Sequence, residues 1–420
     1  MERDEFVIVG GGPAGISALE AIRKVQAEAS ITLIGNETAP LYARMATPYY
    51  LSHVFDESGI LLREPDFLHK NKIKSLLGTK LISLDVKTKT LTLSSGVQMN
   101  YGKLLLATGS SPNVPRISGL NQPGVFYNWT REDAGKMFSR IQNISQAVVI
   151  GSGFIGLQLV QALLNKGIKV SVIEITPQIL PTMLDKQGAE IVEKFLREKG
   201  VNIFTDSVAE SVENCSEKYK AVKLKSGLML STEMIVVAAG VRPNLDFIDN
   251  SGLSLDKGIL VDTQMRTNQP DIFAAGDIAQ AYDLINEKPV LHALWPVAVE
   301  QGRVAGCNMA GRTAVYPGGM SYNILDILDL SAGRVGLLEI NEDMEIISYL
   351  NSSKNLYRRY SFLKGRMVGC LMVGGIEGLG MAKGLIQSKK DLTPYLSKLK
   401  QDPLSLHKVF VSSNYMGTWL

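Results

Sequence analysis

Three glycines near the start of the chain have the spacing of a turn that binds phosphate groups. Gly10, Gly12 and Gly15 follow a short apolar strand in the pattern G-x-G-x-x-G, within the stretch FVIVGGGPAGISALEAI. In such a turn the first glycine allows a tight bend, the second lets the backbone approach a pyrophosphate, and the third lets the next helix pack closely on the strand. Pro13 and Ala14 begin that helix, whose free N–H groups and dipole attract anions. The spacing therefore predicts a nucleotide site.

A second turn of the same kind lies near the middle of the chain. The stretch AVVIGSGFIGLQLVQAL repeats the strand, the turn and the helix. Its turn residues are Gly151, Gly153, Phe154, Ile155 and Gly156. Two dinucleotide sites in one chain suggest a flavin that exchanges electrons with a nicotinamide.

Each turn is followed by a carboxylate at the distance where such sites hold the adenosine ribose. Glu37 lies 22 residues after Gly15, and Glu174 lies 18 residues after Gly156. Glu174 would accept hydrogen bonds from the ribose of NADH but would repel the additional phosphate of NADPH. Two like charges about 4 Å apart repel by up to about 4 kcal/mol at an effective dielectric constant near 20. The sequence therefore predicts NADH, with NADPH the poorer substrate.

The elements that position these residues form two repeated βαβ units. The strands ITLIGNE and VSVIEIT follow the two glycine helices, which predicts two doubly wound α/β domains with parallel sheets. The stretch MIVVAAGVRPN, which contains Gly240, closes the second domain. Alternating strands and a basic helix near residues 378–390 predict a smaller C-terminal α+β domain. The expected domains are a discontinuous first one at 1–115 and 245–315, a second at 116–244, and a C-terminal interface domain at 316–420.

Charge is distributed unevenly along the chain. The net charge is +3, but residues 351–420 hold 11 lysines and arginines against 3 acidic residues. Such a segment favours an acidic protein partner or a phosphate-rich ligand, although a solvated surface without a partner is the more common explanation.

Cysteines and apolar runs bear on the compartment. Cys215, Cys307 and Cys370 have neither disulfide nor metal-ligand spacing, which favours a reducing cytoplasm. The N-terminus lacks the apolar region of a signal peptide, and no apolar run approaches the roughly 18 residues that span a bilayer. A soluble, cytoplasmic protein without a membrane span or a metal site is therefore predicted, and no motif predicts nucleic-acid binding.

The order of five motifs resembles one enzyme superfamily. GGGPAG, KLLLATGS, GSGFIG, VVAAGVRPN and IFAAGD occur as in the FAD- and NAD-dependent pyridine nucleotide-disulfide oxidoreductases, across about residues 5–311. Within it the chain is most similar to rubredoxin reductases, the flavin module of NADH-dependent nitrite reductases, and NADH oxidases. The resemblance implies two domains of the glutathione-reductase type, with FAD in the first and NAD in the second, where Gly240 joins the NAD site.

The resemblance also implies roles for residues outside the glycine turns. It places the ADP half of FAD on the first turn and Glu37, with Thr108 and Gly109 lining the passage of the cofactor. Asp277 of IFAAGD would bond the ribityl chain, and the helix after it would present its N-terminus to the flavin or the pyrophosphate. Arg44 matches a basic residue that related reductases place near FAD, although a solvent-exposed arginine is equally expected.

The segment ARMATPYYLSH departs from the superfamily at its redox centre. NADH oxidases, NADH peroxidases and coenzyme A disulfide reductases have a redox cysteine three residues before Pro-Tyr-Tyr, and Met45 occupies that position here. A thioether forms neither the thiolate that attacks a disulfide nor the sulfenic acid that reduces peroxide. No residue is therefore identified as catalytic, and Met45 is expected to pack beside the flavin.

Three further side chains are interpreted through the resemblance. Related oxygenase-system reductases often pair a lysine after this segment with a glutamate of the second glycine helix, close to flavin N5. Tyr49 and Gln158 stand at the matching positions, so an uncharged pair is expected. His292 precedes the last helix of the first domain and is expected to be a buried, hydrogen-bonded histidine.

These observations predict an NADH-dependent flavoprotein that passes electrons between NAD(H), FAD and an external carrier. An acidic iron–sulfur protein such as rubredoxin or ferredoxin fits both the missing cysteine and the basic C-terminal segment. Two alternatives stay open: an NADH oxidase that forms H2O2 at the flavin, and a flavoprotein subunit with an assembly or NADH-sensing role in a larger redox complex. A homo-oligomer also stays open.

Overall fold

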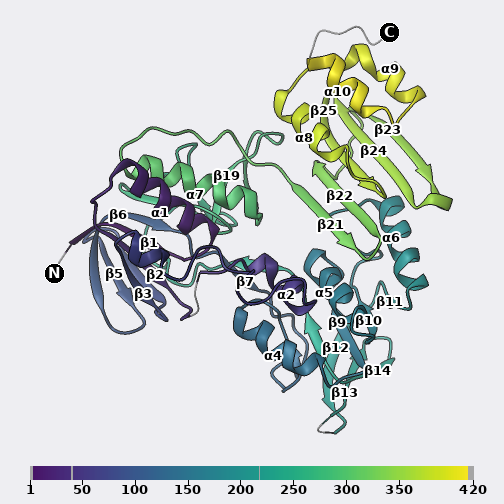
Figure 1. The fold of residues 1–420 in the computed structure, drawn as a ribbon, viewed down its shortest axis with the longest axis horizontal. Helices are drawn as coiled ribbons and strands as arrows, with labels where there is room; N and C mark the ends of the chain where they lie inside the picture. Colours follow the sequence, from purple (N-terminus) through teal and green to yellow (C-terminus); the bar gives the residue numbers. More distant parts are fainter. Residues whose placement is uncertain (1–2, 39–40, 217, 415–420) are drawn as a thin grey trace. The chain divides into compact units, whose positions relative to one another are not determined.

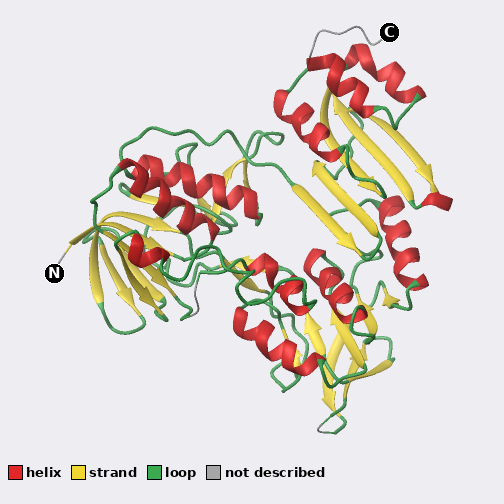
Figure 2. Ribbon diagram, in the orientation of Figure 1, coloured by secondary structure: helices red, strands yellow, loops and turns green. Residues whose placement is uncertain are grey.

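A computed structural model describes residues 3–38, 41–216 and 218–414. The chain forms two compact units, each assembled from separate stretches of sequence. Unit 1 contains residues 1–47, 55–111 and 241–320, and unit 2 contains residues 48–54, 112–240 and 321–420. Figure 1 follows the chain through both units, and Figure 2 shows that each combines helices with sheets. Within the described residues, no helix is both long enough and apolar enough to cross a membrane.

Unit 1 is built on a sheet of order β3-β2-β1-β6-β5-β4, with β18 pairing along β6. Its strands are β1 (Arg3–Val9), β2 (Ile31–Gly35), β3 (Ile73–Leu77), β4 (Leu81–Asp85), β5 (Thr90–Leu93), β6 (Gln98–Leu106) and β18 (Ile272–Ala274). The pairings of β1 with β2 and β6 are parallel, and Ile8 lies beside Leu33 and Leu105. The carboxyl-terminal halves of β1 and β6 are apolar and buried, because both faces of the sheet are covered where the strands pair in parallel.

Two helices of unit 1, α1 (Pro13–Val25) and α7 (Trp295–Met309), lie side by side against this sheet (Figure 1). A Cβ atom added to Gly302 would lie 2.1 Å from the Ala14 carbonyl oxygen, and one added to Gly306 would lie 2.3 Å from that of Ala18. The two helix backbones therefore touch. The remaining elements of this part of the chain are η1 (Arg44–Ala46), α3 (Phe67–Lys70), β7 (Ser110–Pro112), β16 (Val241–Pro243), β17 (Ile259–Leu260), β19 (Ala279–Tyr282) and β20 (Pro289–Leu291).

Unit 2 contains a second parallel sheet, of order β11-β10-β9-β15-β8. Its strands are β8 (Val125–Phe126), β9 (Gln146–Ile150), β10 (Lys169–Ile173), β11 (Asn202–Phe204) and β15 (Ile235–Val237). The helices are α2 (Thr47–Leu51), α4 (Arg131–Ile141), α5 (Phe154–Leu164) and α6 (Lys186–Glu198), and a small antiparallel sheet is formed by β12 (Ala209–Asn214), β13 (Lys220–Leu224) and β14 (Met229–Thr232). The parallel strands at the centre of both sheets confirm the predicted α/β class.

The C-terminal part of unit 2 is an antiparallel sheet of order β21-β22-β25-β24-β23, followed by helices. The strands are β21 (Tyr322–Ile327), β22 (Leu330–Gly336), β23 (Met344–Asn351), β24 (Leu356–Leu363) and β25 (Arg366–Val373), with η2 (Ser352–Lys354) between β23 and β24, and the helices are α8 (Leu379–Ser388), α9 (Thr393–Gln401) and α10 (Leu406–Asn414). Arg358 and Arg359 of β24 are only 8% and 4% exposed. The predicted basic surface must therefore be corrected, because two of its eleven cations are buried.

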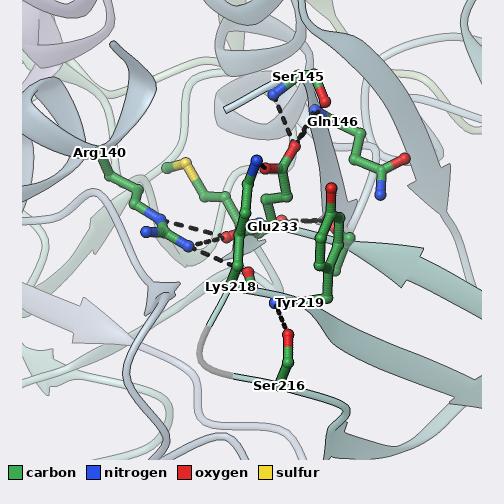
Figure 3. Close-up of polar contacts among 9 residues, drawn as sticks. Arg140, Ser145, Gln146, Ser216, Lys218, Tyr219 and Glu233 are labelled. Atoms are coloured by element: carbon green, nitrogen blue, oxygen red, sulfur yellow. Dashed lines mark hydrogen bonds and ion pairs between the residues drawn. The ribbon is translucent and has the colours of Figure 1, made fainter. Parts of the chain in front are cut away.

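Glu233 anchors the amino ends of β9 and β15 in unit 2 (Figure 3). Its side chain is fully buried, and Oε2 accepts hydrogen bonds from the N–H of Ser145 at 2.7 Å and of Gln146 at 3.2 Å. The ammonium group of Lys218 lies 2.9 Å from Oε1, and Arg140 donates to the Glu233 carbonyl oxygen. Burial raises the pKa of Glu233, but the hydrogen bonds from Lys218 and Ser145 lower it overall to about 2.

Glu233→Gln is expected to lower the free energy of unfolding by about 2 kcal/mol at neutral pH, because an amide replaces a carboxylate that binds several donors. Since the folded pKa lies below the ordinary value of 4.5, this stabilisation is complete above pH 4.5 and is lost as the pH falls toward about 2. Urea unfolding of both proteins across this range measures the difference. Glu210→Gln, which breaks an exposed ion pair with Lys223, is the control and should change little. A difference independent of pH would contradict the role of the ionised carboxylate.

Candidate functional site

The first glycine of each turn occupies a backbone conformation that other residues rarely adopt. Gly10 has φ +120° and Gly151 has φ +103°. A Cβ atom on Gly10 would lie 2.0 Å from the Ala107 carbonyl oxygen, and one on Gly151 would lie 2.4 Å from that of Ala238. Both bends therefore require glycine on conformational and steric grounds.

The second and third glycines of each turn differ in their surroundings. A Cβ atom on Gly15 or Gly156 would lie 1.9 or 2.2 Å from the carbonyl oxygen of the first glycine in its own turn, so the helix packs directly on the strand. A Cβ atom on Gly12 or Gly153 meets no described heavy atom within 4 Å. Open space beside a helix N-terminus is the cradle that a pyrophosphate needs, and both turns fit one.

The carboxylate of Glu37 is held by two side chains that come from the segment after β2. Arg44 forms an ion pair with Glu37, and the Tyr42 hydroxyl donates to Oε2 at 2.7 Å. Arg44 is also close enough to Asp277 to lower the pKa of that carboxyl group in part. The predicted residues Glu37, Arg44 and Asp277 therefore belong to one neighbourhood of unit 1, to which Tyr42 adds a partner that no sequence motif indicated.

Asp277 lies in a turn that connects two other predicted motifs. Burial raises its pKa, although the Ser110 hydroxyl, which donates to Oδ2 at 2.6 Å, opposes this. Ser110 directly follows Thr108 and Gly109, and Asn244 donates from Nδ2 to the Thr108 carbonyl oxygen at 2.8 Å. The stretches ATGS, VRPN and AAGD thus meet in unit 1.

The segment after Asp277 forms strands before it reaches the next helix. A turn and the strand β19 follow Asp277, not a helix, and the next helix, α7, begins at Trp295. Asp277 is therefore not a helix N-cap. The stretch IAQAYDLINEKPVL instead forms the two strands β19 and β20, which pair with each other.

Glu174 follows β10 and is almost fully buried, at 5% exposure. Its Oε2 accepts from the N–H and the hydroxyl of Ser152, at 2.9 and 2.6 Å, and its Oε1 accepts from the N–H and the hydroxyl of Thr176, both at 2.9 Å. Burial raises the pKa of Glu174, but these four hydrogen bonds outweigh it and lower the pKa overall. The carboxylate is therefore charged at neutral pH and also shapes the second glycine turn.

The other predicted residues of the second site lie at the carboxyl edge of the same sheet. Phe154 and Ile155 begin α5, directly after the turn. Gly240 follows β15 with φ +84°, and its carbonyl oxygen accepts from the Asn113 N–H at 2.9 Å. The edge outside the carboxyl ends of parallel strands is where α/β sheets bind ligands.

Met45 lies in η1 beside Arg44, with 47% of its surface exposed. None of the three cysteines lies near Met45 in sequence. Cys215 is exposed, and Cys307 and Cys370 are buried. Burial raises the pKa of Cys370 to about 12, so that thiol stays protonated and inert. Within the described ranges no cluster of side chains could hold a metal ion.

The structure brings Tyr49 and Gln158 together, as the sequence comparison of their positions implied. The Gln158 amide nitrogen lies 3.5 Å from the Tyr49 hydroxyl, while Tyr50 stacks on Phe138. The Oε1 atom of Gln158 is buried without a hydrogen-bond partner among the described residues.

His292 is 7% exposed, and its Nε2 lies 2.7 Å from Oδ2 of Asp283. It is the buried, hydrogen-bonded histidine that was expected.

The sequence of the chain is similar to those of known proteins. The sequence pattern of the pyridine nucleotide-disulphide oxidoreductase family matches residues 4–302. The NADH-dependent phenylglyoxylate dehydrogenase subunit epsilon of Aromatoleum evansii is 31% identical over 418 residues, 99% of each chain. The NADH oxidase of Methanocaldococcus jannaschii is 32% identical over 394 residues, 88% of this chain and 87% of the relative.

A solved structure has the same fold. That of NADH:rubredoxin oxidoreductase from Clostridium acetobutylicum is 26% identical and covers 95% of this chain and 100% of its own, with a TM-score of 0.78. The predicted similarity to NADH oxidases and rubredoxin reductases is thus confirmed. The matched family binds FAD and a pyridine nucleotide, and its range contains both glycine turns and both carboxylates. The protein is therefore an NAD(P)H-dependent flavin oxidoreductase, and it belongs to the pyridine nucleotide-disulphide oxidoreductase family.

Proposed function

We propose that the protein transfers electrons between NADH and an external electron carrier by way of FAD. The observation that carries this proposal is Met45 at the position of the redox cysteine. A thioether cannot store an electron pair as a thiol and disulfide do, so electrons that enter from NADH must leave to an acceptor from outside the chain. The similarity to NADH:rubredoxin oxidoreductase supports a small iron–sulfur protein as that partner.

Unit 1 supplies the residues proposed to hold FAD. They are Gly10, Gly12, Pro13, Ala14, Gly15, Glu37, Arg44, Thr108, Gly109 and Asp277. The N–H groups that begin α1 would bind the pyrophosphate, and Glu37, held in place by Tyr42 and Arg44, would accept from the ribose hydroxyls. When bound, FAD supplies a hydride acceptor that can release electrons singly.

Unit 2 supplies the residues proposed to bind NADH. They are Gly151, Gly153, Phe154, Ile155, Gly156, Glu174 and Gly240. Hydride transfer needs alignment and exclusion of water, and no acid or base from the chain. The role of the protein in this step is therefore to hold NADH in position. The charged Glu174 would disfavour the additional phosphate of NADPH.

The preference for NADH over NADPH can be tested without changing Glu174, whose hydrogen bonds shape the second glycine turn. The next residue, Ile175, is 68% exposed. Ile175→Arg is expected to lower the KM for NADPH about tenfold, because a guanidinium group pairs well with a phosphate, and to change the KM for NADH little. Steady-state kinetics with both nucleotides measure this ratio. Ile175→Gln is the uncharged control, and an equal gain with glutamine would show that charge does not decide the preference.

A second candidate function is favoured by one comparison. The relative from Aromatoleum evansii, matched over 99% of each chain, is a subunit of an NADH-dependent enzyme. We propose as the alternative that the protein is the flavin subunit of a larger redox complex, where it passes electrons to a neighbouring subunit. An H2O2-forming NADH oxidase is the third outcome, supported by the relative from Methanocaldococcus jannaschii.

Anaerobic stopped-flow reduction by NADH and by NADPH, followed by mixing with a panel of carriers, tests these functions. Under the main proposal NADH reduces the flavin, and rubredoxin or ferredoxin reoxidises it much faster than O2 does. The carrier rate should also fall with increasing ionic strength if basic residues guide docking. Rapid peroxide formation without a partner would identify the oxidase, and slow turnover with carriers and O2 would favour the complex subunit.

Three further proposals complete this function. Residues 1–115 and 245–315 would form the FAD domain, residues 116–244 the NAD domain, and residues 316–420 the interface domain. The surface offered to an acidic carrier would consist of the exposed C-terminal cations, which are Lys354, Lys364, Arg366, Lys398, Lys400 and Lys408. The cytoplasm remains the predicted compartment.

A further inference from the structure

The loop between Glu174 and α6 is tied at its first end to the second glycine turn. The N–H of Thr176 donates to Glu174 Oε1, and the N–H of Leu180 donates to the Ser152 carbonyl oxygen at 3.1 Å. Ser152 stands between the glycines of the turn and itself donates to Glu174. Any movement of this loop therefore changes the shape of the proposed NADH site.

The second end of the loop is tied to the C-terminal sheet of the same unit. Oδ2 of Asp185 accepts from the Tyr357 hydroxyl at 2.7 Å and from Nη1 of Arg359 at 2.9 Å. Arg334 donates to the Thr182 carbonyl oxygen at 2.7 Å. Tyr357 and Arg359 are 1% and 4% exposed. The two contacts to Asp185 are thus partly shielded from water, which makes them stronger than the same pairs on a fully exposed surface.

The middle of the loop needs this external support. Ile179, Leu180 and Leu184 are at most 1% exposed and share one hydrophobic core with Tyr357 and Leu371 of the C-terminal sheet. Leu180 has φ +50°, a left-handed conformation that costs a bulky residue about 1 kcal/mol or more. Such a conformation persists only where the surrounding structure fixes it.

We propose that the C-terminal sheet braces the loop of residues 174–185 and so sets the affinity for NADH. Tyr357 and Arg359 act as positioning residues through Asp185. The inference rests on the proposed NADH site in unit 2, and it gives residues 321–414 a role within the reaction besides any contact with a partner.

The sharpest test compares two tyrosines of β24. Tyr357→Phe removes the hydrogen bond to the Asp185 carboxylate, whereas Tyr360→Phe removes a bond of similar length, at 2.8 Å, to the Pro403 carbonyl oxygen on the side away from the loop. Both tyrosines are 1% exposed. Tyr357→Phe is expected to raise the Kd for NADH, measured by calorimetry, about fivefold with kcat and FAD content unchanged, as one partly buried hydrogen bond allows. Tyr360→Phe should leave the Kd unchanged.

Hydrogen exchange of the amides of residues 176–184 provides a measurement without nucleotide. Exchange should be faster in Tyr357→Phe than in the wild type or in Tyr360→Phe. Arg359→Met should enlarge both effects, and Arg359→Lys should restore part of the affinity. Equal Kd values and equal exchange in the two phenylalanine variants would overturn the brace. A wild type that fails to bind NADH would instead overturn the proposed nucleotide site, while the exchange comparison would still decide on the brace.

Discussion

Gly153→Val is expected to give a protein that binds its flavin normally but accepts electrons from NADH about 100-fold more slowly, a loss of about 2.7 kcal/mol. Gly153 has φ −70° and ψ −175°, which valine adopts without strain, and its Cβ would point into open space. The added side chain would therefore disturb little of the protein and would occupy the place where the pyrophosphate approaches the backbone. Stopped-flow reduction, flavin absorbance and thermal unfolding together measure this separation.

The matching change in the first turn is Gly12→Val, which should give a folded protein with little flavin. Gly12 has φ −80° and ψ −173°, and its Cβ would also meet open space. Gly135→Val in α4, where a Cβ again meets nothing within 4 Å, is the control and should reduce neither activity nor flavin content. If Gly153→Val loses flavin while Gly12→Val keeps it, the assignment of the two sites is reversed.

Gly302→Val in α7 is expected to lower the free energy of unfolding by about 3 kcal/mol and to reduce flavin affinity. A Cβ atom there would lie 2.1 Å from the Ala14 carbonyl oxygen, so α7 must move away from α1. Because α1 carries the N–H groups proposed for the pyrophosphate, the effect on FAD arises without any change at the site itself. Urea unfolding and flavin titration of the same sample measure both quantities.

The control for this change is a glycine in a helix with room beside it. Gly380→Val in α8 introduces a side chain that meets no described heavy atom within 4 Å. It should change neither unfolding nor flavin binding. A Gly302→Val protein with unaltered stability would show that the helices can separate freely. The contact between α1 and α7 would then not be needed for FAD binding.

Local patterns predicted the two nucleotide turns because each turn is specified within six residues. Gly10 and Gly151 need a positive φ, and Gly15 and Gly156 face a carbonyl oxygen of their own turn. Whereas the steric limits on Gly10 and Gly151 set by Ala107 and Ala238 come from distant segments, these constraints arise from neighbours in sequence. The same holds for the apolar strands before the turns, which are buried on both faces.

Contacts between distant segments could not be predicted in this way. Ser110 meets Asp277 across 167 residues, and Asp185 meets Arg359 across 174. Nothing near Arg359 in sequence indicates that β24 lies inside its sheet with both faces covered, so its arginines were counted as surface charge. The strand after Asp277 was missed for a related reason, since the short pair β19–β20 is stabilised by its place in unit 1.

Because unit 1 is assembled from separate stretches of sequence, its parts leave the ribosome at different times. Helix α1 is complete at Val25, but its packing partner α7 ends only at Met309. At roughly 5–20 residues per second, the N-terminal strand and helix leave the ribosome about 15–60 s before the helix that covers them. Residues 112–240 emerge within that interval, before the C-terminal sheet that shares their core. The apolar face of α1 therefore stays uncovered until α7 is made, and we expect chaperones to bind it. FAD uptake is expected to follow translation.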